Sequence, residues 1–222
     1  MTDKLKPRIV AAITRADEAA RAESLGADMV EIRMDLVEGD PLDVLGAARR
    51  SCGLPVIATN RMSSEGGRFH GSEEKRMEQL IEASAYADFM DIELRAEGRE
   101  WLMNKVDLPA IVSYHDFHGT PGPEGLRSIL AEISRAGALI AKIAVTPKGL
   151  KDCLDLLSLV LGSDMPLCII AMGEIGMHLR AVAPIYGSAL TYGYISKPTA
   201  PGQMSVAELR SAIDLLWPSA TL

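Results

Sequence analysis

The chain has 222 residues, 48% of them apolar and 24% charged, and its formal net charge is −7. These values are typical of a globular protein and exclude a disordered or membrane-embedded one, while the negative charge offers no basic surface to nucleic acid. We expect a single domain over residues 1–222, long enough to bury a substantial core.

The amino-terminal segment is short, polar and charged, and no apolar stretch approaches the roughly 20 residues of a membrane-spanning helix. We therefore expect a cytoplasmic protein that binds neither membrane nor nucleic acid. Cys52, Cys153 and Cys168 are scattered without the spacing of metal ligands. They predict neither a disulfide framework nor a zinc site, so we expect core thiols.

Short apolar runs alternate with segments of helical period, which is typical of repeated strand–helix units. The first half predicts a strand at 8–13, a helix at 17–25, a strand at 29–33, a helix at 42–50, a strand at 55–59, a polar loop at 60–72, a helix at 73–86, a strand at 89–94 and a helix at 99–105. The second half predicts a strand at 110–114, a helix at 123–136, a strand at 139–145, a helix at 150–161, a strand at 167–172, a short helix at 175–183, a strand at 189–193, a loop at 194–204 and a helix at 206–217.

Eight strands, each followed by a helix, favour a compact α/β fold, the (β/α)8 or TIM barrel. An open doubly wound sheet usually has fewer strands, and the first strand-to-helix turn lacks the GxGxxG fingerprint of a dinucleotide site. In a barrel the active site lies at the carboxyl ends of the strands, so reactive residues should gather there.

Lys142 lies within the run 139–145, which is otherwise apolar and rich in Ile and Val. Such a run is typical of a strand that is buried on both faces. Burial favours the neutral amine, so we expect the pKa of Lys142 to fall below its usual value, which would make the amine a nucleophile for a ketone or aldehyde. The alternative is an edge-strand lysine whose amine reaches water.

Polar residues occur at the carboxyl ends of the predicted strands and in the loops that follow them, namely Glu31, Arg33, Arg61, Glu65, His115, Lys142, Arg180 and Gln203. The strands of His115 and Lys142 are consecutive and should pair about 4.8 Å apart. A base beside an iminium-forming lysine is the arrangement that removal of a proton next to a carbonyl requires.

His115 also has simpler interpretations. It could be a strand-end histidine bonded to Asp116 or to backbone. It could also ligate a metal together with His118, but no third and fourth ligand is evident in the sequence, so metal binding is not expected.

The charged residues have structural interpretations as well. Arg33 and Arg61 could form ordinary salt bridges with nearby carboxylates, namely Glu31, Asp35 or Glu65. Asp91 and Glu93 lie inside a predicted strand and could be buried carboxylates paired with one of these cations. What favours a functional interpretation is that arginines, a histidine and a lysine all fall at the same end of successive strands.

Eight short motifs follow one another nearly from end to end of the chain: Glu31-Ile32-Arg33-Met34-Asp35, Arg61 with Glu65-Gly66-Gly67, Asp91-Ile92-Glu93-Leu94, Ser113-Tyr114-His115-Asp116-Phe117, Lys142-Ile143-Ala144-Val145, Met172-Gly173 with Gly176 and Arg180, Tyr186-Gly187-Ser188, and Ala200-Pro201-Gly202-Gln203. In content and order they resemble the type I 3-dehydroquinate dehydratase family. A single motif of this kind is weakly specific, whereas eight in register are highly specific.

The resemblance implies syn dehydration of 3-dehydroquinate to 3-dehydroshikimate through a lysine Schiff base, the third step of the shikimate pathway, without metal or organic cofactor. It implies Lys142 as the nucleophile, His115 as the proton donor and acceptor, and Glu65 as the carboxylate that orients His115. The substrate-binding residues that it implies are Glu31, Arg33, Arg61, Arg180, Thr199 and Gln203, with Arg180 on the substrate carboxylate. Family members commonly form dimers, so a homodimer is expected.

Three positions depart from the family's pattern. Ala12 stands where many members have a serine, and Leu179 replaces a serine often found before the carboxylate-binding arginine. Thr199 replaces another serine but keeps the hydroxyl. The segment 195–203 still resembles the family's closing loop, so these changes concern individual substrate contacts and leave the predicted catalytic residues in place.

Two alternatives to the dehydratase remain. A class I aldolase or transaldolase would share the lysine chemistry but cleave a carbon–carbon bond, often on a phosphorylated substrate. No Gly-rich phosphate cradle follows the last two predicted strands, which disfavours that alternative. The second is a non-catalytic module that senses quinate-like ligands, and it would not need Lys142, His115 and Glu65 together.

Overall fold

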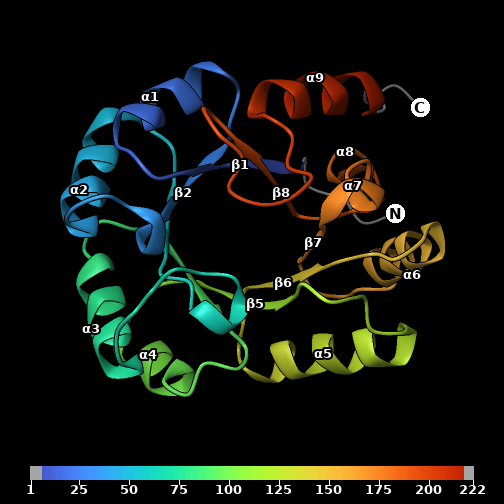
Figure 1. Ribbon diagram of the computed structural model, residues 1–222, viewed down its shortest axis with the longest axis horizontal. Coiled ribbons are helices and arrows are strands. Elements are labelled where there is room, and N and C mark those ends of the chain that lie inside the picture. The colour runs from blue at the N-terminus through green and yellow to red at the C-terminus, as the bar shows by residue number, and fades with distance from the viewer. Residues whose placement is uncertain (1–6, 218–222) are drawn as a thin grey trace.

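The computed structural model describes residues 7–217. Parallel strands form one central sheet that the helices surround, so the fold is the expected (β/α)8 barrel (Figure 1). The strands are β1 (Arg8–Ile13), β2 (Met29–Arg33), β3 (Val56–Thr59), β4 (Phe89–Glu93), β5 (Ala110–Asp116), β6 (Ile140–Val145), β7 (Leu167–Ala171) and β8 (Leu190–Tyr194). The expected domain, 1–222, also includes residues 1–6 and 218–222, which lie outside the described residues.

The helices form the outer layer of the barrel: α1 (Asp17–Ser24), α2 (Pro41–Ser51), α3 (Glu73–Ala83), α4 (Arg99–Lys105), α5 (Pro123–Arg135), α6 (Leu150–Leu161), α7 (Gly173–Gly176), α8 (Leu179–Tyr186) and α9 (Val206–Leu216). Side chains cap several of them. Asp40 accepts a hydrogen bond from Leu42 N at the start of α2, and Ser205 with Glu208 forms a capping box at the start of α9. Within residues 7–217, no helix is both long enough and apolar enough to cross a membrane.

The barrel is nearly closed. Consecutive strands pair from β1 to β7, and β8 pairs with β1, where Val10 lies opposite Tyr192. At the seam between β7 and β8, Ala189 N donates to Leu167 O at 2.8 Å and Ile169 N donates to Ser188 Oγ at 3.1 Å. Inward-facing side chains from all eight strands therefore share one interior.

Strand alternation divides the buried side chains into two cores. One set, which includes Met29, Ile57 and Ile111, packs in the barrel interior. The alternate residues, such as Val30 and Val112, pack beneath the helices. Because apolar side chains fill the lower interior, inward-facing polar residues are concentrated toward the carboxyl ends of the strands.

Most predicted elements agree with the structure to within a few residues at either end. The predicted helix at 175–183 is wrong, because two helices, α7 and α8, occupy this region. Gly176 ends α7 and packs so closely on Ala171 that a Cβ at position 176 would lie 2.6 Å from the Ala171 Cβ. β5 extends two residues further than predicted, so His115 lies inside the strand. Two 3-10 turns, η1 (Met34–Leu36) and η2 (Ser63–Glu65), were not predicted.

Candidate active site

A cavity of about 200 Å³ lies at the carboxyl ends of the strands. The residues predicted to form the site all line it, namely Glu31, Arg33, Arg61, Glu65, His115, Lys142, Arg180, Thr199 and Gln203. The prediction that the barrel brings these residues together is therefore confirmed. Their individual roles remain predictions.

Lys142 occupies the centre of β6, whose residues are all buried. Alternation directs Ile140, Lys142 and Ala144 into the barrel, while Ile143 packs beneath the helices. Lys142 is only 5% exposed, and Nζ lies 2.8 Å from Asp91 Oδ2. The structure therefore confirms a buried lysine and excludes the edge-strand alternative.

The expected fall in the pKa of Lys142 is wrong. Burial lowers this pKa, but the negative charges of Asp91 and Glu31 outweigh burial and hold the pKa of Lys142 above its usual value. Glu31 Oε1 lies 3.4 Å from Nζ. In the ion pair of Lys142 with Asp91, burial alone would raise the pKa of the Asp91 carboxyl. The positive charges of Arg61 and Lys142 instead hold this pKa well below its usual range. The resting site therefore contains an ammonium ion.

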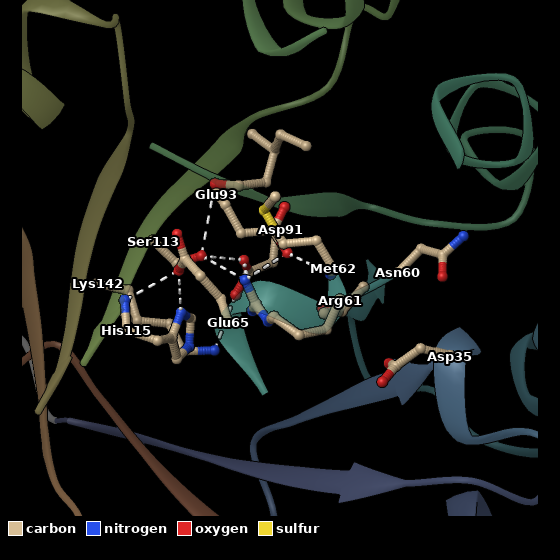
Figure 2. A network of polar contacts seen from close by, with 12 residues as sticks. Asp35, Asn60, Arg61, Met62, Glu65, Asp91, Glu93, Ser113, His115 and Lys142 are labelled. Carbon is tan, nitrogen blue, oxygen red and sulfur yellow. Dashed lines mark hydrogen bonds and ion pairs between the residues drawn. The ribbon is translucent and has the colours of Figure 1, made fainter. Parts of the chain in front are cut away.

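Buried ion pairs join Asp91, Arg61 and Glu93 beside Lys142 (Figure 2), and a further pair links Glu93 to Arg76 of α3. Arg61 Nη2 lies 2.9 Å from Asp91 Oδ1, and Arg61 Nη1 lies 3.0 Å from Glu93 Oε1. Glu93 Oε2 in turn lies 2.7 Å from Nη1 of Arg76, which also pairs with Glu73. Asp91 and Glu93 are thus the paired buried carboxylates that the sequence suggested. This series of ion pairs holds Arg61 at the edge of the cavity.

Arg76→Met is expected to lower the free energy of unfolding by about 3–5 kcal/mol, because it leaves the buried Glu93 with one cationic partner in place of two. Asn60 O also loses a donor. Urea titration followed by circular dichroism measures this change. Lys75→Met on the same helix is the matched control, because Lys75 is exposed. A loss below about 1 kcal/mol, as for a surface pair, would contradict the stabilising role of Arg76.

His115 lies on β5, the strand that pairs with β6, and its position is opposite Ala144. Its Nδ1 lies 2.9 Å from Glu65 Oε2, and its backbone N donates to the same oxygen at 3.0 Å. Glu65 comes from the turn η2, which ends at Gly66 with a positive φ of 79°. His115 is therefore held by a carboxylate, and Asp116 instead accepts from the backbone of His118.

The surroundings keep His115 neutral. Burial, together with the positive charges of Arg61 and Lys142, lowers the pKa of His115 well below its usual value. Burial also raises the pKa of Glu65 to about 7, although the charge of Arg61 opposes that rise. In the tautomer that donates Nδ1–H to Glu65, the other ring nitrogen of His115 is free to act as a base.

Arg180 is 1% exposed and pairs with no carboxylate among residues 7–217. Its Nη1 and Nη2 donate to the backbone carbonyls of Tyr192 and Pro201 at 3.3 Å and 3.2 Å, and its Nε has no partner among these residues. Burial lowers the pKa of Arg180 to about 10, so the group remains charged at neutral pH. A buried, unpaired guanidinium at the cavity fits an anionic group of a ligand.

Arg33 faces the cavity and also forms a bidentate salt bridge with Asp35, at 2.9 Å and 2.8 Å. Glu31 Oε1 accepts from Thr59 Oγ1 at 2.9 Å. The sequence suggested salt bridges of Arg33 and Arg61 with Glu31, Asp35 or Glu65. The pair Arg33–Asp35 is confirmed, whereas Arg61 pairs with Asp91 and Glu93.

Thr199 and Gln203 come from the loop between β8 and α9. Gln203 Oε1 accepts from Thr199 N at 2.7 Å and from Thr199 Oγ1 at 3.1 Å. Loop residues Ala200 and Pro201 line the cavity beside them. Of the departures from the family's pattern, Ala12 also lines the cavity, but Leu179 is buried in the outer core.

Two residues at the site were missed or undervalued by sequence reasoning. Asp91 was interpreted as structural, yet it makes the shortest polar contact of Lys142. Tyr192 was not singled out, although its place two residues after Leu190 on one face of β8 indicates that it faces inward. No three His, Cys, Asp or Glu side chains within 7–217 are grouped so as to hold a metal ion.

A lysine buried at the cavity of a (β/α)8 barrel, with a histidine on the adjoining strand, is typical of the barrel enzymes that have a lysine in the active site. Comparison with known proteins narrows that class, because the family model described as type I 3-dehydroquinase matches residues 10–218. The chain belongs to the type I 3-dehydroquinase family and is accordingly a hydro-lyase of the shikimate pathway.

Relatives found by sequence and relatives found by structure both agree with this assignment. The 3-dehydroquinate dehydratase of Methanothrix thermoacetophila is 53% identical over 95% of this chain and 92% of its own length, and that of Methanocella arvoryzae is 44% identical over 95% and 97%. The crystal structure of the Geobacillus kaustophilus 3-dehydroquinate dehydratase has a TM-score of 0.90 at 27% identity, covering 98% of this chain and 93% of that one. The type I enzyme of Clostridium difficile has a TM-score of 0.87 at 31% identity, covering 95% and 92%.

Proposed function

We propose that this protein dehydrates 3-dehydroquinate to 3-dehydroshikimate by syn elimination, through a Schiff base between the substrate ketone and Lys142. The observation that carries the proposal is the position of Lys142, buried at the cavity between carboxylates and one strand away from a neutral histidine. The crystal structure of the related type I enzyme from Clostridium difficile contains covalently modified comenic acid, which supports covalent chemistry for this family.

Lys142 must lose a proton before it attacks the ketone, since the resting group is an ammonium ion. The neutral imidazole of His115 is the base that faces the same cavity, and we assign this proton transfer to it. The amine then adds to the ketone carbon, and the carbinolamine loses its oxygen as water after His115 supplies a proton. The product of this step is an iminium ion.

The charges that raise the pKa of Lys142 also favour the iminium. Asp91 and Glu31 stabilise positive charge on Nζ whether the nitrogen carries protons or a bond to the substrate. The nitrogen is neutral while the amine attacks, but the surroundings that stabilise the ammonium are already in place for the iminium that follows. The iminium withdraws electrons from the adjacent carbon and acidifies its protons.

His115 then removes a proton from the carbon beside the iminium and returns it to the departing hydroxyl on the same face. The carbon–oxygen bond breaks, water leaves, and a carbon–carbon double bond forms between the two carbons. Glu65 orients the imidazole through Nδ1 and stabilises the imidazolium that forms transiently. Hydrolysis of the product imine regenerates Lys142.

Arg180 is assigned to the substrate carboxylate, because its buried guanidinium lacks an anionic partner among residues 7–217. We assign Glu31, Arg33, Arg61, Thr199 and Gln203 to the substrate hydroxyls. Thr199 and Gln203 lie on a loop that would cover the ligand and exclude water.

Product analysis tests this function against its alternatives. Incubation with 3-dehydroquinate stereospecifically deuterated at the carbon beside the ketone should give 3-dehydroshikimate that has lost only the label on the face of the leaving hydroxyl. Loss of the opposite label would contradict syn elimination. A carbon–carbon cleavage product would indicate an aldolase, and binding without any product would indicate the quinate-sensing module.

The raised pKa of Glu65 predicts the pH dependence of turnover. Because the ionised form of Glu65 orients His115, kcat/KM should be high above about pH 7 and should fall as Glu65 takes up a proton below it. Glu65→Gln should lower kcat/KM by about 10²- to 10⁴-fold and remove this inflection, since the amide does not titrate. A wild-type inflection that persists in Glu65→Gln would contradict the assignment.

We further propose that the chain acts as one catalytic domain, as a homodimer in the cytoplasm, without metal or organic cofactor. The exposed leucines of α6 support an interface between copies, because Leu150, Leu154 and Leu161 are 58–68% exposed on one face of the helix. Sedimentation measures the oligomeric state, and turnover after dialysis against a chelator tests the absence of a metal.

A further inference from the structure

We propose that Tyr192 contacts the substrate directly, with its ring against the reacting nitrogen and its hydroxyl bonded to the substrate hydroxyl next to the ketone carbon. This inference rests on the proposed Schiff base at Lys142. It adds to the site a residue that the sequence motifs did not indicate.

Position is the first argument. Tyr192 lies in the middle of β8, opposite Val10 of β1, and it packs within the barrel interior. It is only 5% exposed, yet it lines the same cavity as Lys142 and Arg180. The Tyr192 side chain therefore forms part of the wall of the cavity that contains the reacting nitrogen.

The ring supplies the second argument. Lys142 Nζ lies 4.1 Å from the centroid of the Tyr192 ring, on the aromatic face. The negative face of an aromatic ring attracts a cation, and this attraction strengthens where water is excluded. Together with Asp91 and Glu31, the ring therefore surrounds a nitrogen that is cationic as ammonium and again as iminium.

The hydroxyl supplies the third argument. The phenol oxygen of Tyr192 is buried and has no hydrogen-bond partner among the described residues. A buried polar group without a partner is costly, so such a group at a cavity indicates a partner supplied by a ligand. Burial also raises the pKa of Tyr192 well above its usual value, which keeps the hydroxyl protonated and able to donate.

The identity of the partner follows from the contact between the ring and Nζ. Once the substrate is joined to Nζ, the ketone carbon lies at this nitrogen, and the groups on its neighbouring carbons lie nearest to Tyr192. One of these carbons loses the proton during elimination, whereas the other carries a hydroxyl that stays on the product. That retained hydroxyl is the one we assign to the Tyr192 phenol.

Tyr192→Phe isolates the hydroxyl, because it keeps the ring over Nζ. With 3-dehydroquinate, KM should rise about 3- to 10-fold while kcat changes less than about twofold. With the analogue that lacks the hydroxyl next to the ketone, wild type and Tyr192→Phe should have equal KM. Tyr194→Phe on the same strand is the matched control, because Tyr194 is not among the residues that line the cavity.

Tyr192→Leu removes the ring as well, and it should lower kcat by about 5- to 30-fold relative to Tyr192→Phe by destabilising the iminium. An unchanged KM for Tyr192→Phe, or the same rise with the analogue, would overturn the hydroxyl contact. Borohydride trapping of wild type and of each variant separates the role of Tyr192 from the Schiff base at Lys142 on which it rests. If wild type forms no adduct, the Schiff base itself is contradicted; if all variants are trapped and KM is unaltered, only the role of Tyr192 is contradicted.

Discussion

Replacing Lys142 by alanine should abolish imine formation and lower kcat by about 10⁴-fold or more, because the reaction loses its nucleophile and its electron sink together. Lys142→Arg should be equally inactive, although it keeps a positive charge between Asp91 and Glu31, since a guanidinium does not form an imine. Steady-state formation of 3-dehydroshikimate measures both effects. The comparison separates the chemistry of the amine from its charge.

Lys151→Ala is the matched control for this experiment. Lys151 is exposed on α6 and pairs with Asp155 across one helical turn, so its loss should leave kcat and KM within about twofold of wild type. Measurable turnover in Lys142→Arg, within about tenfold of wild type, would show that the group acts as a charge rather than as a nucleophile.

Removing the imidazole of His115 should also have a large effect. His115→Ala should lower kcat by about 10²- to 10⁴-fold, because both the proton abstraction and the hydrolysis of the imine lose their proton carrier. Imine formation also loses this proton carrier, but protons on nitrogen and oxygen exchange readily with water, whereas the proton on carbon does not. Proton abstraction from carbon should therefore become the slowest step, and a larger fraction of the protein should carry a borohydride-trapped adduct during turnover. Rapid-quench kinetics with intact-mass detection measures both quantities.

His118→Ala is the control for His115→Ala, because His118 lies three positions further on and is exposed. It should behave as wild type. Near-normal turnover by His115→Ala would refute the assigned base. A loss of turnover without any trapped adduct would contradict this order of rates, because it would make imine formation the slowest step in His115→Ala.

Much of the fold was predictable from the alternation of apolar residues along the chain. The run around Lys142 predicted a strand buried on both faces. His115 follows the preceding predicted strand, 110–114, and consecutive strands were expected to pair, as they do in the structure. The division of the region around Gly176 into two helices was not predictable from periodicity, because no repeat in the sequence indicates that Gly176, where α7 ends, packs directly against Ala171 at the end of β7.

The residues of the site were predictable by their place at the ends of strands and by their resemblance to a family, but their electrostatics were not. Burial alone predicted a low pKa for Lys142. The opposite direction follows from Asp91 and Glu31, which come from β4 and β2 and contact Lys142 only in the closed barrel. The contact of Tyr192 with Lys142 Nζ was not predictable for a similar reason, because it joins β8 to β6 across the barrel interior.

The raised pKa of Lys142 changes how such a site should be understood. A lysine made reactive by burial alone would be neutral at rest, whereas this site stabilises the cation before and after the bond to the substrate forms. The cost is one proton transfer at the start of the reaction. His115, kept neutral by burial and by the nearby cations, is suited to accept it.

The central claim is that Lys142 forms a covalent imine with 3-dehydroquinate, and borohydride trapping tests it most directly. The protein is incubated with substrate and borohydride, its intact mass is measured, and the modified peptide is mapped. We expect one substrate-derived adduct per chain, located on Lys142. An unmodified protein, or an adduct on another lysine, under conditions that trap a known type I enzyme, would contradict the proposed mechanism.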